Sequence, residues 1–398
     1  MLPRRAPGPL DNKLPTEILS QRALNRALLA RQHLLRRRKA SAAEEIEHLV
    51  AMQAQVPDGP YVGLWSRLQG FRPDELADLI NKRRAIRLGL LRNTIHLVTA
   101  RDALQLRALF QPLFERGLKT TPFGRNLVGL DMGPVIARAT ELMKERPRTF
   151  SELGNLLLER WPDRDPTALA YGIRHLVPIL QVPPRGIWGK KAQATWTSAE
   201  LWLGRPLTGR PSVGKFVLRY LAAFGPSSVA DASSWSGLTG LRDVVERLRP
   251  KLRTFRDERG RELFDVADGP LPDPETPAPP RFLPEYDNLL IGHEDRTRVI
   301  HRDYRYSIFM GTLLVDGFIQ GTWAIQRRRD TATLVIEPLR RLTKLERQTV
   351  AEEGEQLLAF AAAEPLQRIV RITDVATSPP LPGQLSQKMR DSQRSTDR

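Results

Sequence analysis

The first strong hydrophobic pattern in the chain begins at Ile18, where apolar residues start to recur at intervals of three or four. This spacing predicts an amphipathic helix whose apolar stripe faces the core. The remaining positions carry a run of basic residues that includes Arg22, Arg26, Arg31, Arg36, Arg37, Arg38 and Lys39. Such a run is typical of a solvated face, and it suits a surface that contacts phosphate groups nearly as well.

A second helical pattern extends from Ala42 to Gln53 and is broken by the Pro-Asp-Gly-Pro segment 57–60. Gln53 and Gln55 fall at the C-terminal end of this predicted helix, one residue apart. A Gln-x-Gln pair is common and by itself indicates only a polar helix end. Both side chains can reach one cleft if the backbone leaves helical geometry before Pro57.

A helix is predicted over 74–82, two extended apolar runs over 85–91 and 94–98, and a further helix over 100–114. Helix, turn, helix and two-stranded ribbon is the order of a winged helix. The same order recurs over 149–196, where two helices precede a short pair of strands. It recurs again over 216–266, where three short helices precede a pair of strands. We therefore expect three winged-helix units in tandem, at 16–120, 121–210 and 211–269.

The pattern changes after a proline-dense break at 269–280. Strands are predicted at 288–292, 309–315, 317–323, 331–338 and 368–372, with one long helix at 343–362. A β-rich domain is therefore expected at 270–375, and the segments 1–15 and 376–398 are expected to be disordered. The predicted fold class is α+β, with mainly helical tandem winged-helix domains and a C-terminal antiparallel β-sheet or barrel.

The net charge of the chain indicates which class of molecule it binds. Lys and Arg number 62 against 45 Asp and Glu, which gives a formal net charge of +17. A chain this basic is expected to bind a polyanion, with double-stranded DNA as the default, because neutralising phosphates releases counterions. A genome rich in G and C, which enriches arginine everywhere, is the other explanation of the excess.

Composition also excludes several kinds of site and location. The chain has no cysteine, which rules out disulfides, thiolate metal sites and cysteine nucleophiles. No apolar run approaches the about 18 residues of a membrane span, and the first residues lack the apolar core of a secretory signal. We expect a cytoplasmic, nucleoid-associated protein without a cofactor. The lack of an extended heptad pattern favours a monomer.

Several short segments carry a family resemblance. Residues 30–32, 52–55, 91–98 and 283–293, together with Asp316-Gly317 and Gly321-Thr322-Trp323, resemble the AlkZ family of bacterial DNA glycosylases. The resemblance spans about residues 18 to 375. It implies tandem winged helices and a role in DNA repair or in self-protection of producers of DNA-crosslinking antibiotics. Family members that unhook crosslinks carry a Gln-x-Gln motif, and a broader branch carries Gln-x-Asp. Because this sequence has Gln-x-Gln, the resemblance implies that Gln53 and Gln55 are catalytic.

Two glutamines suffice for this chemistry if the leaving base is already cationic. A purine alkylated at ring nitrogen 7 departs neutral, so no general acid is needed. Holding a water and offering dipoles to the developing sugar cation remain, and amide side chains can do both. Excision of cationic lesions and crosslinks, but not of uracil or hypoxanthine, is expected. Because no lysine stands beside the pair in sequence, hydrolysis without strand cleavage is expected.

Other residues are weaker candidates. Thr94 and His96 share a strand face. The family resemblance implies that both line the lesion cleft, with His96 as a donor or a phosphate ligand, and the alternative is that His96 is a half-buried strand histidine. Asp287 and His293 lack metal-ligand spacing, so no metal site is expected, and Tyr286 and Asp287 are expected to fix a turn.

Further basic residues are candidates for DNA contact. Arg296 and Arg298 alternate on a segment predicted to be extended, which suits a hairpin at the minor groove or a solvated ribbon. The exposed turn at Arg327, Arg328 and Arg329 suits a phosphate contact, because three adjacent cations repel one another without an anion.

Two further functions use the same elements. Winged helices most often belong to transcription regulators, in which a recognition helix reads the major groove. A non-catalytic protein that binds lesions is the weaker third alternative. Release of a base from alkylated DNA separates the enzyme from both.

Overall fold

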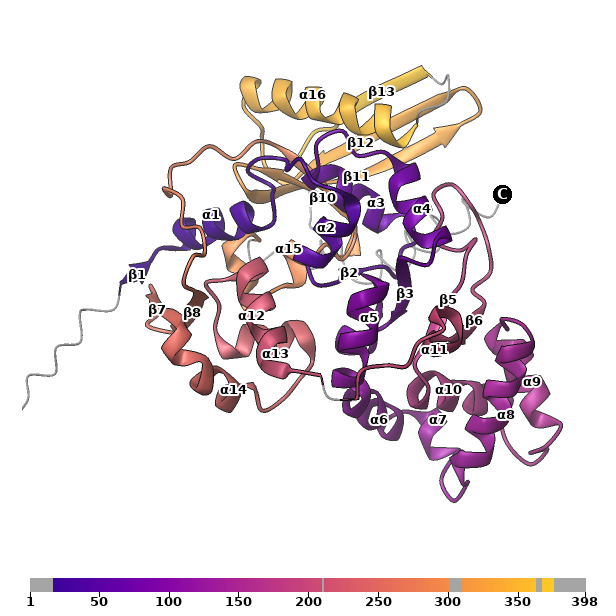
Figure 1. Cartoon of the computed structure of the whole chain (residues 1–398). Helices are drawn as coiled ribbons and strands as arrows, with labels where there is room; N and C mark the ends of the chain where they lie inside the picture. Colours follow the sequence, from indigo (N-terminus) through magenta and orange to yellow (C-terminus); the bar gives the residue numbers. More distant parts are fainter. Residues whose placement is uncertain (1–16, 210, 301–308, 363–366, 376–398) are drawn as a thin grey trace, which may run out of the picture.

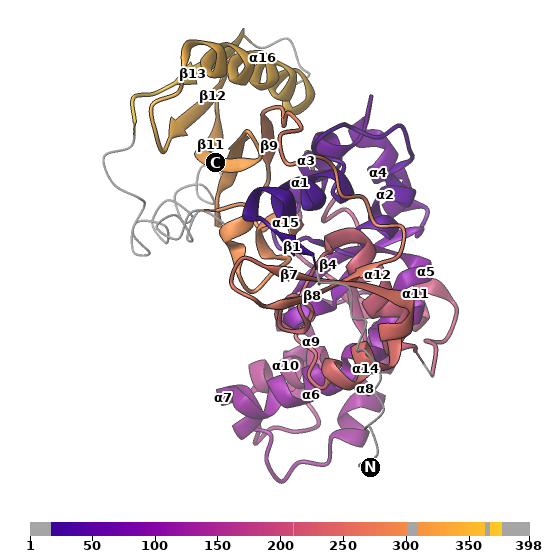
Figure 2. The ribbon, with the colours of Figure 1, turned by 90° about the vertical axis from the view of Figure 1, so that its left-hand side faces the viewer.

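The computed structural model describes residues 17–209, 211–300, 309–362 and 367–375. Both segments that we predict to be disordered, 1–15 and 376–398, lie outside these residues. In two views a quarter-turn apart, the C-terminal sheet with its long helix lies at one end of the molecule and helices α6 to α10 lie at the other (Figure 1 and Figure 2). The N-terminal elements and helices α12 to α14 fill the region between them.

The N-terminal region alternates helices with short strands. Its elements are β1 (Ile18–Leu19), α1 (Gln21–Arg31), α2 (Ala42–His48), β2 (Met52–Gln53), α3 (Gly59–Arg67), α4 (Pro73–Asn81), β3 (Ala85–Gly89), η1 (Leu91–Asn93), β4 (Ile95–Thr99), α5 (Ala100–Leu106), η2 (Arg107–Phe110) and α6 (Gln111–Thr120). The helix predicted to reach Gln53 ends at His48, because Val50 adopts a left-handed backbone with φ of 68°. The predicted first helix ends at Arg31, so Arg36 to Lys39 are not helical.

A five-stranded antiparallel sheet with the order β2-β4-β3-β5-β6 lies at the centre. β5 (Ile179–Gln181) and β6 (Trp196–Ser198) come from the second predicted unit, and β3 joins them through the pairing of Arg87 with Gln181. The residues of these strands are buried except Gln53 and Gln181, which are half-buried. The ribbons predicted for the first two units are therefore parts of one sheet, which binds the two segments together.

The next two segments are mainly helical. They contain α7 (Pro122–Arg125), α8 (Met132–Glu145), α9 (Phe150–Leu158), α10 (Pro166–Leu176), α11 (Ala199–Leu203), α12 (Val213–Phe224), α13 (Val229–Ser236), α14 (Leu241–Leu248), η3 (Arg249–Lys251), β7 (Leu252–Asp257) and β8 (Glu262–Val266). The elements of the third segment follow the predicted order. β1 from the N-terminus adds a parallel strand to the β7–β8 ribbon. Assignment of these segments as winged helices stays a prediction.

The C-terminal region carries a second five-stranded sheet, of order β13-β12-β11-β10-β9. Its elements are β9 (Arg281–Leu283), α15 (Asn288–Ile291), η4 (Arg296–Arg298), β10 (Gly311–Val315), β11 (Phe318–Arg328), β12 (Thr331–Pro338), α16 (Lys344–Ala361) and β13 (Gln367–Ile372). The pairs are antiparallel except β12 with β13, which is parallel. The predicted α+β fold class is confirmed.

Two predictions within the C-terminal region are wrong. Residues 288–292, predicted as a strand, contain the helical turn α15, because the Asp287 side chain accepts a hydrogen bond from Leu289 N at 2.9 Å and caps it. The segment from Arg296 to Arg298, predicted to be extended, is a turn of 3₁₀ helix capped in the same way by Asp295. Throughout the described ranges, the helices are too short or too polar to cross a bilayer.

Candidate functional site

Gln53 lies on β2, a short edge strand of the central sheet, and Gln55 follows in a bend two residues later. Gln53 pairs with His96 of β4, and Ala54 N donates to Ile95 O at 2.8 Å. Gln53 Nε2 donates to Gln55 Oε1 at 2.6 Å, with Gln53 half-buried and Gln55 exposed. The structure brings the predicted pair together where the chain leaves a strand and not at a helix end.

Local sequence explains why this strand forms. The left-handed Val50 turns the chain out of α2, and the apolar side chains of Leu49, Ala51, Met52 and Ala54 are all buried. These residues anchor the backbone on both sides of Gln53. The glutamines are thus the polar positions of an otherwise buried segment, held by packing and by the β4 ladder.

Arg92 holds the pair from the neighbouring turn. It lies in η1 between β3 and β4, with φ of 51°, and its Nη2 donates to Gln53 Oε1 at 2.8 Å. Its Nη1 donates to the carbonyl of Trp235 in α13. Burial, with the nearby positive charge of Arg296 as the smaller cause, lowers the pKa of Arg92 to about 10, so it remains a cation at neutral pH. Hydrogen bonds therefore run from Arg92 through Gln53 to Gln55.

Arg92 did not emerge as a site residue from the sequence, where Arg92-Asn93 reads as a polar turn. Both residues have positive φ, 51° and 58°, which is uncommon for residues other than glycine. Asn93 Nδ2 lies 2.9 Å from His175 Nε2. The backbone conformation that marks this turn is visible only in the structure.

His96 lies inside the protein and does not line an open cleft. It is 0% exposed, and its Nδ1 lies 3.0 Å from Thr94 O, so Nδ1 carries the proton that is donated to this carbonyl. Burial lowers the pKa of His96 to about 3, with the charge of Arg92 acting in the same direction. A neutral, enclosed imidazole cannot ligate a phosphate. The expectation that His96 lines the cleft is corrected, while Thr94 is half-buried and donates from Oγ1 to Leu91 O.

A narrow hollow separates Gln53 from the loop at 284–288. Asp287, which lines it, is committed to Arg67, whose two Nη atoms donate to the carboxylate at 2.7 and 2.9 Å. Asp287 thus fixes the turn into α15, and His293 is buried against Ser227 Oγ. Over the described ranges, no group of three His, Asp or Glu side chains is placed to hold a metal ion.

Two arginines predicted to contact DNA lie inside the protein. Arg31 is 2% exposed, and its Nη2 forms an ion pair of 2.8 Å with the buried Asp265. Arg298 is 4% exposed and donates to Pro226 O at 3.1 Å. Neither side chain can reach a phosphate, so these two predictions are wrong.

The other predicted arginines differ in how free they are. Arg37 is engaged within the protein, since Nη2 lies 2.6 Å from Glu353 Oε1 and the guanidinium stacks over Trp65. Arg36 and Arg38 are exposed.

Arg327, Arg328 and Arg329 are also exposed, at the turn between β11 and β12, although Arg327 donates to Ala361 O. Arg296 is half-buried, and in the described part of the chain it has neither a hydrogen-bond acceptor nor an acidic partner.

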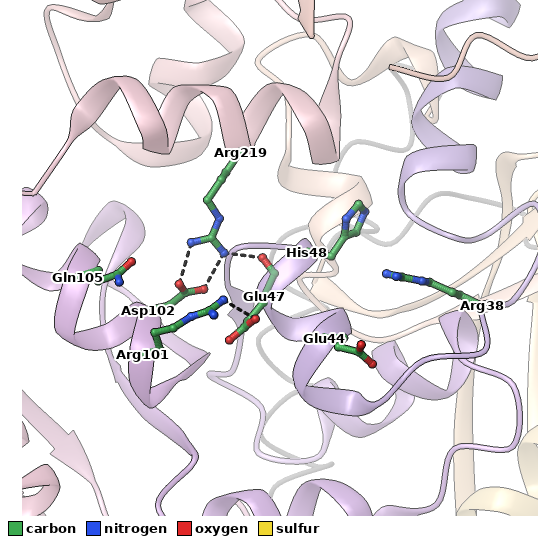
Figure 3. A pocket seen from close by; sticks show the side chains of 8 residues that line it. All are labelled: Arg38, Glu44, Glu47, His48, Arg101, Asp102, Gln105 and Arg219. Atoms are coloured by element: carbon green, nitrogen blue, oxygen red, sulfur yellow. Dashed lines mark hydrogen bonds and ion pairs between the residues drawn. The ribbon is translucent and has the colours of Figure 1, made fainter. Parts of the chain in front are cut away.

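A larger cavity of about 440 Å³ lies between α2, α5 and α12 (Figure 3). Arg219 binds the Asp102 carboxylate through both Nη atoms, at 2.8 and 2.6 Å, and Arg101 pairs with Glu47. These charges largely neutralise one another. The residues around the cavity are Arg38, Glu44, Glu47, His48, Arg101, Asp102, Gln105 and Arg219, so the glutamine pair does not face it.

Known proteins resemble this chain in sequence family and in fold. A family model described as DNA glycosylase AlkZ-like matches residues 46–360. The solved structure of Streptomyces sahachiroi DNA glycosylase AlkZ superposes with a TM-score of 0.70 and 19% sequence identity. The superposition covers 89% of this chain and 100% of that one, and at this identity it establishes a shared fold. No curated protein matches the sequence.

Proposed function

The chain belongs to the AlkZ-like family of DNA glycosylases, and from this premise we propose that it hydrolyses the N-glycosidic bond of cationic N7-alkylated purines. The proposed substrates include bulky adducts and interstrand crosslinks in double-stranded DNA. The observation that carries the proposal is the 2.6 Å contact between Gln53 and Gln55, held in place by the half-buried cation Arg92.

The hydrogen bonds already made define what the pair can offer a substrate. Gln53 uses its carbonyl to accept from Arg92 and one N–H to donate to Gln55. One N–H of Gln53 and both N–H groups of Gln55 remain, together with free lone pairs on the two carbonyls. These groups can hold a water near the sugar carbon and present dipoles to a developing oxocarbenium ion.

The reaction needs no acid when the base is cationic. The bond between C1′ and the purine nitrogen breaks, and its electron pair neutralises the positive base, which leaves uncharged. Water then forms the new bond to C1′ and loses a proton. Uracil and hypoxanthine would depart as anions, and an amide side chain is not an acid that can protonate them.

Hydrolysis without strand cleavage is the mode that the site supports. Strand cleavage by a bifunctional glycosylase needs an amine that attacks C1′ and forms a Schiff base. No lysine lines the hollow beside Gln53, and none is bonded to either glutamine in the part of the chain that the structure describes. We therefore propose a monofunctional enzyme.

An exposed Gln55 favours bulky substrates. A lesion that cannot be extruded into a closed pocket can still be approached by a pair of side chains at an edge strand. This supports a role in DNA repair or in resistance to a genotoxin, exercised on the nucleoid by a monomer.

Base release from defined duplexes tests the proposal. Duplexes with N7-methylguanine or with an N7-linked interstrand crosslink should yield abasic sites, revealed by heat or alkali, and the Gln53→Ala and Gln55→Ala variants should lose this activity. Duplexes with uracil or hypoxanthine serve as controls and should remain intact. Equal cleavage of uracil would contradict the mechanism. Sequence-specific binding without base release would instead favour a winged-helix transcription regulator.

A further inference from the structure

The hollow beside Gln53 has the dimensions of a water site. It encloses about 10 Å³, which is close to the space that one water molecule requires. Polar side chains line it from two directions, with Gln53 on β2 and Glu285 and Asn288 on the facing loop. Gln53 and Glu285 are only half-buried, so a substrate can approach both.

The side-chain oxygen of Asn288 is a hydrogen-bond acceptor that receives no hydrogen bond from the described residues. The side chain is 4% exposed, and its Nδ2 donates to Ala51 O at 2.6 Å, which fixes the orientation of the amide. Its Oδ1 is buried and has no hydrogen-bond partner among the described residues. Buried carbonyl oxygens are almost always paired with protein or with ordered water, so this atom requires a donor.

Glu285 supplies a carboxyl group that no cation neutralises. Asp287, the other carboxylate of the hollow, is held by both Nη atoms of Arg67, whereas Glu285 forms no ion pair within the described ranges. Burial raises the pKa of Glu285, and the negative charge of Asp58 acts in the same direction. A carboxyl with a raised pKa is a stronger base once it is ionised.

We propose that this hollow holds the nucleophilic water and that Glu285 is the catalytic base that receives its proton. The proposal rests on the glycosylase function proposed above. The water donates one hydrogen bond to Asn288 Oδ1 and one to the Glu285 carboxylate, and it accepts the spare N–H of Gln53. Its remaining lone pair is free to attack C1′.

The step is balanced in atoms and electrons. The C1′–N bond breaks and its electron pair passes to the cationic purine, which leaves neutral. A lone pair of the water forms the C1′–O bond, and the proton released from that water passes to Glu285. In this mechanism the glutamines position the water and present dipoles to the sugar cation. Glu285 supplies the base that a Gln-x-Gln pair lacks.

Few other charges face Glu285. Asp58 at the start of α3 and the phenol of Tyr286 lie beside it, and burial keeps the pKa of Tyr286 above its ordinary value. The remaining charges on the hollow, Arg67 and Asp287, neutralise each other. Asp58, whose pKa burial also raises, is the other carboxyl that can titrate here, so the pH dependence is assigned to Glu285 by its loss in the Glu285→Gln variant.

Single-turnover excision of N7-methylguanine, followed from acidic to mildly alkaline pH, tests the proposal. The wild-type rate should rise with pH as Glu285 ionises. Glu285→Gln should lower the rate at neutral pH about a hundredfold and abolish the rise, because general base catalysis typically contributes at least that factor. Glu294→Gln, which changes an exposed carboxyl nine residues further along the chain, is the matched control and should keep both rate and profile.

Different failures have different meanings. A wild-type rate that does not change with pH, or a Glu285→Gln protein with the wild-type rate, overturns the role of Glu285. If Gln53→Ala abolishes excision in the same assay, the proposed glycosylase function stands even where the role of Glu285 is overturned. A wild-type protein that excises no cationic base overturns both. Affinity for a duplex with a non-cleavable abasic analogue, which should be unchanged by Glu285→Gln, shows that the variant is folded.

Discussion

Arg92 places a half-buried positive charge 2.8 Å from the side-chain oxygen of Gln53. This contact fixes which end of the Gln53 amide faces inward, because only oxygen can accept from a guanidinium. The amide nitrogen is thereby directed to Gln55 Oε1. The orientation of both glutamines thus depends on a residue about forty positions further along the chain.

Replacement of Arg92 by lysine should slow base excision without unfolding the protein. Arg92→Lys keeps the charge but cannot reach both Gln53 and the carbonyl of Trp235 with a planar fork. We expect the single-turnover rate on N7-methylguanine to fall about tenfold to a hundredfold, with smaller change in binding. Arg83→Lys is a matched control, because Arg83 also has positive φ but lies at the surface. An unchanged rate in Arg92→Lys would remove Arg92 from the site.

Arg296 should contact the DNA backbone. It lies close enough to Arg92 to lower the pKa of that residue, and no carboxylate offsets the two charges in the described part of the chain. Such a pair favours an anion such as a phosphate. Arg296→Gln should weaken binding to any duplex and reduce the slope of log affinity against log salt by about 1. Arg347→Gln, at an exposed position on α16, should leave the slope unchanged.

Periodic elements were predictable from the sequence, because their signals are local. The helices α4, α9 and α16 and the strands β3, β4 and β12 follow hydrophobic spacing, capping residues and turns that lie within each segment. The proximity of Gln53 and Gln55 was also predictable, although for a different reason. Their side chains meet where the chain leaves β2, and β2 exists only through pairing with β4, more than forty residues away.

Side-chain roles were less predictable, because they depend on contacts distant in sequence. Arg31 and Arg36 look alike in the same basic run, yet Arg31 is buried against Asp265 and Arg36 is exposed. Glu285 belongs to a recognisable motif, but only the fold brings it to the hollow beside Gln53. Single-sequence patterns carry no information on such pairs.

The Arg31–Asp265 pair should stabilise the fold and not the complex with DNA. Both side chains are buried, and Asp265 also accepts from Arg253 at 2.9 Å. Arg31→Ala would leave a buried carboxylate with one partner fewer, so the free energy of unfolding should fall by about 3 to 5 kcal/mol. Denaturant unfolding measures this loss. Arg36→Ala should change it by less than about 0.5 kcal/mol, and equal effects would contradict the assignment.

Acid should destabilise the protein through two buried histidines. Burial lowers the pKa of His96 and of His293 to about 3, well below the value of about 6.5 for an unfolded histidine. Between these values the unfolded chain binds protons that the folded chain does not. The free energy of unfolding contributed by each histidine is therefore complete above about pH 6.5 and is lost progressively as the pH falls towards about 3.

The expected loss of unfolding free energy in acid is large enough to measure. At about pH 5 each histidine should lower the free energy of unfolding by about 2 kcal/mol relative to neutral pH. This follows from the difference of about 1.5 units between that pH and the pKa of an unfolded histidine. Urea unfolding at neutral pH and at about pH 5 tests this. His96→Gln, which cannot gain a proton in the unfolded state, should reduce the acid-induced loss by about the share of one histidine. If the loss stayed the same, His96 would have to be protonated in the folded protein, which its enclosure beside Arg92 argues against.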